Sequence, residues 1–451
     1  MWRSLDLDPV DGSRTEQVAA LIIRRIERGD LAIGSRLPSE RTLADTLGVS
    51  RVTVVRALGL LRQDGTLSTR HGSGSQVLPL DRLADPVAPA STRQPGDDQV
   101  VDLRFATTAA PHEVAEAYAR LVNTGLPAAM AGDGPPVGGS GVLRSALAER
   151  LSTSGSVTDA AHLTLTVGAA SALEAVIAAL DVAPGIALTE TPTYPAALDI
   201  FRRHRLDVVG WPAGAAGWDL DQLAHLCRRL RPRVVYLQAD NHNPTGLSMP
   251  SDRRAAAVEE IRRSGAVLVS DETLRPLWLA DGAQPAPLSG LAGVVGIGSL
   301  SKTVWGGLRV GWIRSSRMLR RRIVAGAPAG LVSPGALDEL LALELGPSLD
   351  GIAERRRSLL RANLTGLEST LGAVPGVAWS TPTGGMTLWL ELLRHRPRQL
   401  TAAARRHGLL LSHGELFTPD QAARQHIRLP YTASTDTLTL AVERLHAAMS
   451  S

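Results

Sequence analysis

The chain has 451 residues, of which 44% are hydrophobic and 20% charged, and its formal net charge is +4. This length predicts roughly two to four globular domains, and the absence of any apolar run near the roughly 20 residues of a membrane helix excludes a membrane-spanning chain. A single cysteine, Cys227, and an acidic N-terminus without an apolar stretch indicate a cytoplasmic protein that has neither an internal disulfide nor a signal peptide.

Residues 1–80 carry the pattern of a DNA-binding module. Apolar residues at helical spacing predict a first helix over 15–26, a second that begins after Ser39, and a third over 51–63 that follows a short turn. Two helices joined by a short turn are typical of the helix-turn-helix motif. Residues 66–77 then predict a two-stranded wing with a polar tip.

The segments LPSERTLADTLGVSRVTVVRAL and RHGSGSQV resemble the winged helix of the GntR regulators. The resemblance implies that the partner is a double-stranded DNA operator. It also implies that residues of the second helix, the third helix and the wing contact this DNA: Arg41, Arg51, Thr53, Arg56, His71 and Gly72. A solvated helix face is the alternative for each arginine taken singly.

The rest of the chain predicts a linker followed by an α/β domain. Residues 81–99 contain three prolines and no apolar periodicity, so a semi-extended linker is expected there. Within 100–451, strand and helix patterns alternate, most clearly over 160–320, which predicts a mainly parallel sheet covered by helices on both faces. Residues from about 330 to 451 are expected to form a small α+β domain.

Lys302 is the only lysine in the chain, because the other 47 of the 48 basic residues are arginines. Unlike arginine, lysine readily loses a proton and attacks a carbonyl, so Lys302 is a candidate for a Schiff base. Ser299, Ser301 and Arg309 lie nearby in sequence and would suit the phosphate of a phosphorylated aldehyde. An ordinary surface lysine on a loop is the alternative.

The segment SLSKTVWGGLRVGW, residues 299–312, resembles the lysine segment of the fold-type I aminotransferases. The resemblance implies pyridoxal 5′-phosphate bound to Lys302, which would also be the catalytic residue. Gly168, Ala169 and Ala170 open an apolar helix and match the position that holds the phosphate in this family, although the glutamine common there is Ala170.

Four further residues match motifs of this family. Tyr194, fixed between two prolines, matches the aromatic residue that stacks on the pyridine ring, with core packing as the alternative. The resemblance implies that Asp271 contacts the pyridine nitrogen and that Asn243 contacts the phenolic oxygen. It also implies that Arg428 binds a substrate carboxylate; a salt-bridged surface arginine is the alternative.

Two tyrosines of the family are replaced in this chain. Thr273 and Leu274 stand where a tyrosine usually follows the aspartate, and residues 133–136 lack the tyrosine that often reaches the phosphate of a neighbouring subunit. These departures favour cofactor binding over efficient turnover.

A GntR-like winged helix joined to an aminotransferase-like domain is the architecture of the MocR regulators. We therefore expect a homodimeric transcriptional regulator that uses bound pyridoxal phosphate to sense an amino compound or a B6 vitamer, with no metal site. The alternative is a working aminotransferase, a transaminase with an accessory DNA-binding domain. A cofactor-free scaffold that only dimerises the winged helices is disfavoured by the retained residues Lys302, Asp271, Asn243 and Arg309.

Overall fold

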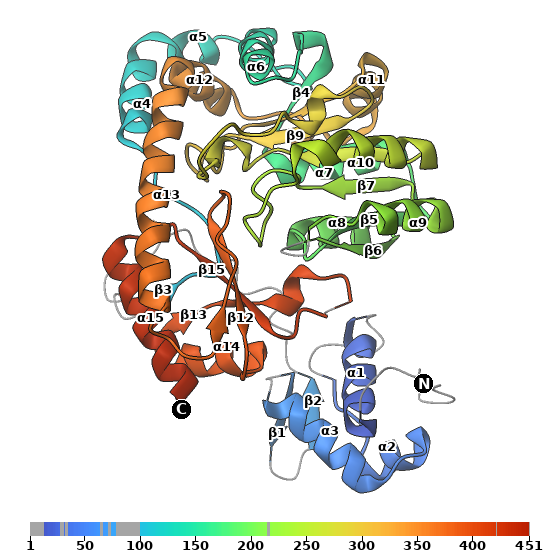
Figure 1. The fold of residues 1–451 in the computed structure, drawn as a ribbon. Helices are drawn as coiled ribbons and strands as arrows, with labels where there is room; N and C mark the ends of the chain where they lie inside the picture. The colour runs from blue at the N-terminus through green and yellow to red at the C-terminus, as the bar shows by residue number, and fades with distance from the viewer. Residues whose placement is uncertain are drawn as a thin grey trace. The chain divides into compact units, whose positions relative to one another are not determined.

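The computed structural model describes residues 13–27, 31, 35–63, 66–70, 74–77, 100–213, 217–420 and 422–450. The expected linker and the predicted DNA contacts His71 and Gly72 lie outside these residues. The chain divides into two compact units: Met1–Val101 with Arg398–Leu409 and Ala447–Ser451, and Asp102–Pro397 with Leu410–His446 (Figure 1).

The N-terminal residues form a winged helix-turn-helix, as predicted. Its helices are α1 (Arg14–Glu27), α2 (Glu40–Leu47) and α3 (Arg51–Gln63), and its wing pairs β1 (Leu67–Arg70) with β2 (Gly74–Val77) antiparallel. Ser39 caps α2 by accepting a hydrogen bond from the backbone of Thr42, and Gly48 ends it in the left-handed conformation at φ 62°. A core from all three helices and the wing includes Val18, Ile22, Leu43, Val54, Leu58, Leu61, Leu67 and Val77.

The larger unit contains a seven-stranded sheet with the order β4-β10-β9-β8-β7-β5-β6. Its strands are β4 (Leu163–Thr166), β5 (Gly185–Thr191), β6 (Leu206–Pro212), β7 (Val234–Leu237), β8 (Val267–Asp271), β9 (Val295–Ser299) and β10 (Gly311–Arg314). The sheet is mainly parallel, as predicted, except that β10 runs antiparallel to both β9 and β4. The chain reverses between β9 and β10, and Lys302 lies in that connection.

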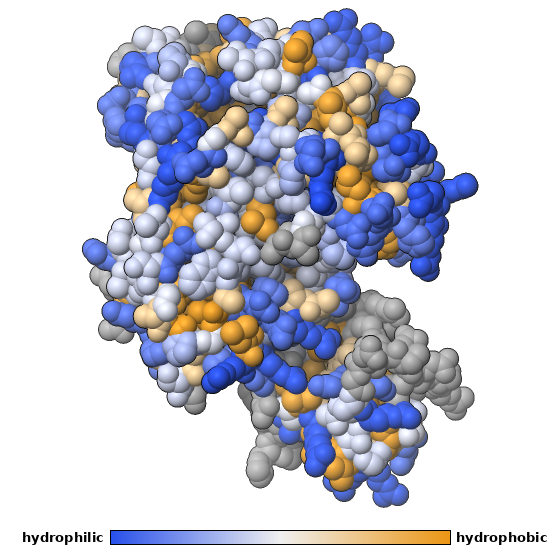
Figure 2. All heavy atoms as spheres, in the orientation of Figure 1, coloured by the Kyte–Doolittle hydropathy of each residue, from blue (hydrophilic) through white to orange (hydrophobic). Residues whose placement is uncertain are grey.

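Helices cover both faces of this sheet. Successive residues of a strand point to opposite faces, so neighbouring residues of one strand join different cores. Tyr236 and Val269 join a core with α7 (Ala169–Leu180), α8 (Pro195–Arg203) and α11 (Arg317–Gly326). Val235 and Leu268 join the opposite core with α9 (Leu220–Leu230) and α10 (Ser251–Ser264). Figure 2 shows polar and charged side chains over much of the visible surface, and the exposed side of α10 carries ion pairs such as Arg262–Glu259.

Further helices and a second sheet complete the fold. A third core lies among α4 (His112–Thr124), α6 (Gly141–Thr153) and α12 (Ala336–Leu345), with α5 (Leu126–Met130) after α4. A four-stranded antiparallel sheet has the order β11 (Val377–Ala378), β12 (Thr387–Leu392), β15 (His426–Pro430), β14 (Ser412–His413). The remaining elements are α13 (Leu349–Leu371), α14 (Pro397–Arg406), α15 (Thr435–Ser450) and the paired strands β3 (Val101–Asp102) and β13 (Leu409–Leu410). Among the described helices, none has the length and apolar character needed to cross a membrane.

Candidate functional site

Lys302 lies half-buried in the loop between β9 and β10, with its Nζ donating a hydrogen bond to the carbonyl of Ala106 at 2.8 Å. Ser299 closes the base of this loop. Its hydroxyl lies 3.0 Å from the Val310 carbonyl and from the Ser301 hydroxyl, and it accepts a hydrogen bond from the Ser301 backbone. Because these contacts already use the buried hydroxyl of Ser299, the structure assigns it a role in shaping the loop; its role as a phosphate ligand stays a prediction.

The surroundings of Lys302 favour the uncharged amine. Burial, and after it the guanidinium groups of Arg428 and Arg309, lower the pKa of Lys302, whereas Asp271 raises it; together they bring the pKa to about 8. A lysine with a pKa near 8 is partly neutral at neutral pH, and only the neutral amine attacks a carbonyl. The same interactions indicate that Asp271 and Arg428, which are distant in sequence from Lys302 and Arg309, lie in one region with them.

The N-terminus of α7 forms a cradle suited to an anion. Gly168 precedes the helix at φ 110°, and no side chain caps the helix there. A Cβ placed on Gly168 would lie 3.7 Å from the Arg309 guanidinium, and one on Gly311 would lie only 2.7 Å from the Gly168 backbone. The close approach of Gly168 and Gly311 thus brings the Arg309 guanidinium next to the backbone amides of Ala169 and Ala170. The guanidinium and the amides both favour binding of a phosphate.

Asp271 lies at the end of β8 with both carboxylate oxygens hydrogen-bonded. Its Oδ1 accepts from the backbone of Thr273 at 2.9 Å, and its Oδ2 accepts from the hydroxyl of Tyr236 at 2.8 Å. Tyr194, at the start of α8, is close enough to be affected by this charge. Burial raises the pKa of Tyr194, Asp271 raises it further, and Arg428 and Arg309 lower it. The predicted ring-stacking residue and the predicted partner of the ring nitrogen therefore lie in the same pocket.

Arg428, on β15, is a buried cation without an acidic partner in the described part of the chain. It donates to the Asn243 amide oxygen at 3.3 Å and to the Arg104 carbonyl, and its guanidinium lies 4.9 Å from the centre of the Phe417 ring. Its Nε has no hydrogen-bond partner there, and burial lowers its pKa to about 10. A buried guanidinium in this situation can bind a carboxylate ligand. Arg428 is thus no salt-bridged surface arginine.

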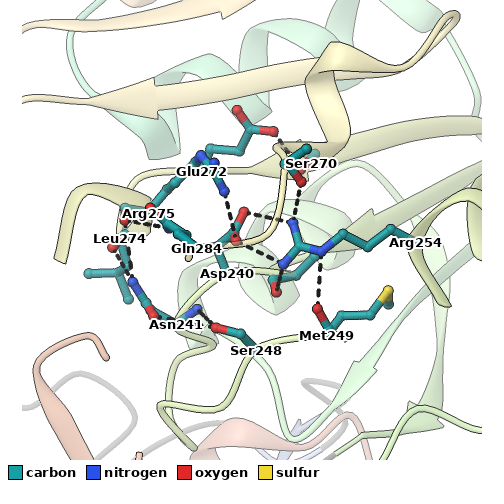
Figure 3. A network of polar contacts seen from close by, with 12 residues as sticks. Asp240, Asn241, Ser248, Met249, Arg254, Ser270, Glu272, Leu274, Arg275 and Gln284 are labelled. Atoms are coloured by element: carbon teal, nitrogen blue, oxygen red, sulfur yellow. Dashed lines mark hydrogen bonds and ion pairs between the residues drawn. The ribbon is translucent and has the colours of Figure 1, made fainter. Parts of the chain in front are cut away.

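A buried polar network, shown in Figure 3, fixes the two loops that carry Asn243 and Asp271. Asp240 accepts hydrogen bonds from Arg254 at 2.8 and 3.3 Å and from Arg275 at 2.9 Å. Arg254 also donates to the carbonyls of Met249, Ala239 and Ala286. The amide of Asn241 donates to the Leu274 carbonyl at 2.8 Å, which ties the loop after β7 directly to the loop after β8.

Sequence reasoning missed several residues of this pocket. Tyr236 and Gln238 contact the predicted ring residues, yet their role depends on β7 lying next to β8, which no motif reports. The alternation of side chains along β7 could have placed Tyr236 on the same face as Val234, which lies in the same core. The carbonyls of Arg104 and Ala106 carry no side-chain signal at all.

The predicted DNA contacts within the described residues lie on α2 and α3. Arg41, Arg51 and Arg56 are exposed, and the Arg51 side chain, 71% exposed, pairs with Glu40 at 3.3 Å. Thr53 is half-buried, and its backbone N–H donates to the Ser50 hydroxyl, which caps α3. The first two turns of α3 therefore present two arginines to solvent, as a recognition helix does.

Residues 103–445 match the aminotransferase class I and II family, and residues 14–77 match the bacterial regulatory proteins of the gntR family. The chain therefore belongs to the aminotransferase class I and II family and also carries a GntR-type DNA-binding domain. It is a transcriptional regulator with an aminotransferase-like domain, which is the architecture of the MocR regulators, as the sequence predicted.

The chain is 26% identical to the uncharacterized HTH-type transcriptional regulator YdfD of Bacillus subtilis, with 92% of each chain covered. It is 28% identical to the pyridoxine biosynthesis transcriptional regulator PdxR of Corynebacterium glutamicum, with 85% of this chain and 84% of PdxR covered. The structure of the α-aminoadipate aminotransferase LysN of Thermus thermophilus, in complex with N-(5′-phosphopyridoxyl)-L-leucine, matches with a TM-score of 0.72 at 26% identity. That match covers 78% of this chain and 92% of LysN.

Proposed function

We propose that this regulator holds pyridoxal 5′-phosphate on Lys302 and senses an amino compound or a B6 vitamer, which changes its affinity for a DNA operator. The strongest support is that Lys302, with its lowered pKa, lies near the buried guanidinium of Arg428, whose Nε has no hydrogen-bond partner among the described residues. When bound, pyridoxal phosphate supplies an aldehyde that reacts reversibly with amines. The phosphopyridoxyl-leucine in LysN and the name of PdxR support this ligand class.

The residues present fit this group. Lys302 would bind it covalently, and the α7 amides with Arg309 and Ser301 would hold its phosphate in the cradle beside Gly168. Tyr194 would stack on the ring. Asp271 would keep the ring nitrogen protonated, and Asn243 would contact the phenolic oxygen.

Arg428 would bind the carboxylate of an amino-acid ligand, and the described residues offer it no acidic group to displace. The segment after Asp271 offers no phenol, since Thr273 and Leu274 stand there. The hydroxyl of Thr273 is buried without a hydrogen-bond partner in the described chain, and Leu274 contributes only its backbone carbonyl. A bound amine would therefore persist more readily than it would turn over, which suits a sensor.

We further propose that the protein acts as a homodimer in the bacterial cytoplasm. The DNA-binding module supports this, since helix-turn-helix dimers place two recognition helices on two operator half-sites. In the winged helix, α2 would supply Arg41 as a DNA contact, and α3 would supply Arg51, Thr53 and Arg56. His71 and Gly72 of the wing remain predictions.

The DNA-binding half of the proposal is tested by Arg51→Ala and Arg56→Ala. Each variant is expected to weaken binding to an operator selected from random DNA by about 1–3 kcal/mol, because an arginine contact to a base edge is lost. Operator affinity is measured by fluorescence anisotropy at a fixed salt concentration. Cofactor absorbance should stay unchanged.

The matched control is Arg262→Ala, which removes an exposed, ion-paired arginine from α10. It should leave operator affinity at the wild-type value. Unchanged operator affinity in both Arg51→Ala and Arg56→Ala would contradict the proposal that α3 is the recognition helix. A parallel loss of cofactor absorbance would mean that these arginines support the fold instead.

A further inference from the structure

Gln238, just after β7, contacts Asn243 directly and Asp271 through the hydroxyl of Tyr236. Its Oε1 accepts a hydrogen bond from the Asn243 backbone at 2.9 Å. Its Nε2 donates to the Tyr236 hydroxyl at 2.8 Å, and that hydroxyl lies 2.8 Å from Asp271 Oδ2. All of these groups are buried or nearly so. One side-chain amide thus links the loop after β7 to Tyr236 and, through Tyr236, to Asp271 at the end of β8.

The chemistry of these groups fixes the direction of each hydrogen bond. The backbone N–H of Asn243 can only donate, so the amide oxygen of Gln238 must face it and the amide nitrogen must face Tyr236. The Tyr236 oxygen then accepts from Gln238, and its only proton is directed to Asp271. Burial and the charge of Asp271 raise the pKa of Tyr236, so the phenol stays a neutral donor.

The backbone around Gln238 limits its alternatives. Its N–H donates to Glu190 Oε2 at 2.6 Å, and Glu190 also accepts from the Trp218 indole at 2.8 Å. The Tyr236 ring packs against Phe201 with its centre 6.1 Å away. The main chain of Gln238 is therefore held by a hydrogen bond and the Tyr236 ring by packing, and the polar ends of the two side chains are left to contact Asn243 and Asp271.

We infer that Gln238 and Tyr236 are positioning residues that hold the carboxylate of Asp271 in place and anchor Asn243 toward the ring of pyridoxal phosphate. The inference rests on the proposed function. A hydrogen bond donated to a buried carboxylate favours its charged form. A charged Asp271 would keep the nitrogen of the cofactor ring protonated. The positive charge on the ring would then lower the basicity of the Lys302 nitrogen that is bonded to the cofactor.

The test uses full-length protein reconstituted with pyridoxal phosphate, with the visible absorbance of the bound cofactor followed against pH. Tyr236→Phe keeps the ring and removes only the donor to Asp271. The pH midpoint of the visible band is expected to rise by about one unit, the size typical of losing one charge-assisted hydrogen bond. The other ionisable groups near Asp271, namely Tyr194, Glu190 and Lys302, are unchanged in the variant.

Gln238→Met provides a second, independent variant of similar size. It is expected to raise the same midpoint by a smaller amount, because the Tyr236 oxygen loses the hydrogen bond from Gln238 that strengthens its own donation to Asp271. It should also weaken cofactor binding by roughly tenfold, since the Asn243 backbone loses its anchor. If Tyr236→Phe fails to fold, as judged by circular dichroism, this variant decides the inference.

Tyr431→Phe is the matched control, because Tyr431 is equally buried and, among the described residues, its hydroxyl donates only to the Gly384 carbonyl. It should keep the wild-type midpoint. Wild-type midpoints in both Tyr236→Phe and Gln238→Met, or an equal shift in Tyr431→Phe, would overturn the inference while leaving the cofactor on Lys302. Wild-type protein without any visible band would instead overturn the proposed function.

Discussion

Replacing Lys302 with alanine is expected to abolish the visible absorbance of protein incubated with pyridoxal phosphate. The chain has no second lysine that could take its place. The lowered pKa of Lys302 and its position among Arg309, Arg428 and Asp271 make it the amine that would react. Borohydride reduction followed by mass spectrometry of the intact chain should show cofactor fixed to the wild type only.

Lys302→Arg is the stricter control, because it keeps a cation in the loop and can still donate to the Ala106 carbonyl. It should be as unreactive as the alanine variant. Cofactor fixed to Lys302→Arg by borohydride would place the linkage elsewhere and contradict the assignment.

Asp240→Ala is expected to lower the free energy of unfolding of the aminotransferase-like domain by about 3–5 kcal/mol, because it leaves the buried guanidinium of Arg254 without its carboxylate partner. The variant removes the only carboxylate that Arg254 and Arg275 contact in the described chain. Two guanidinium groups would stay buried beside the loops that carry Asn243 and Asp271. Urea unfolding followed by circular dichroism measures the change.

Glu259→Ala removes a carboxylate that pairs with Arg262 on the exposed side of α10, and it serves as the control. Its urea midpoint should stay at the wild-type value, because exposed ion pairs contribute little. An Asp240→Ala midpoint equal to that of the wild type would show that the network in Figure 3 does not stabilise the domain.

Periodicity and local motifs were sufficient to predict the architecture. The winged helix follows from apolar spacing and from the capping residues Ser39 and Gly48, because these act within one or two helical turns. The helix-covered sheet follows from alternating strand and helix patterns. Gly168 could be predicted because a glycine turn opens α7, and Lys302 because it is the only lysine in the chain and lies within a recognisable motif.

The rest depended on contacts between distant segments. The hydrogen bond from Tyr236 to Asp271 forms because β7 and β8 are neighbours in the sheet. The sequence of neither strand indicates which strand lies next to it. The carbonyls that meet Lys302 and Arg428 come from the segment around 104–106, where any residue type would supply the same oxygen. Ser299 matches a motif, yet its hydroxyl is used to close the loop.

A ligand bound at the cofactor site is expected to change the affinity of the protein for its DNA operator. The experiment titrates reconstituted protein with amino acids and primary amines while cofactor absorbance and operator affinity are recorded in the same samples. A matching amine should change both with the same half-saturation, and operator affinity should change by roughly 5- to 150-fold, the range of typical coupling energies. Keto-acid production should be slow or undetectable. Rapid multiple turnover with no change in operator affinity would contradict the account and favour a working aminotransferase.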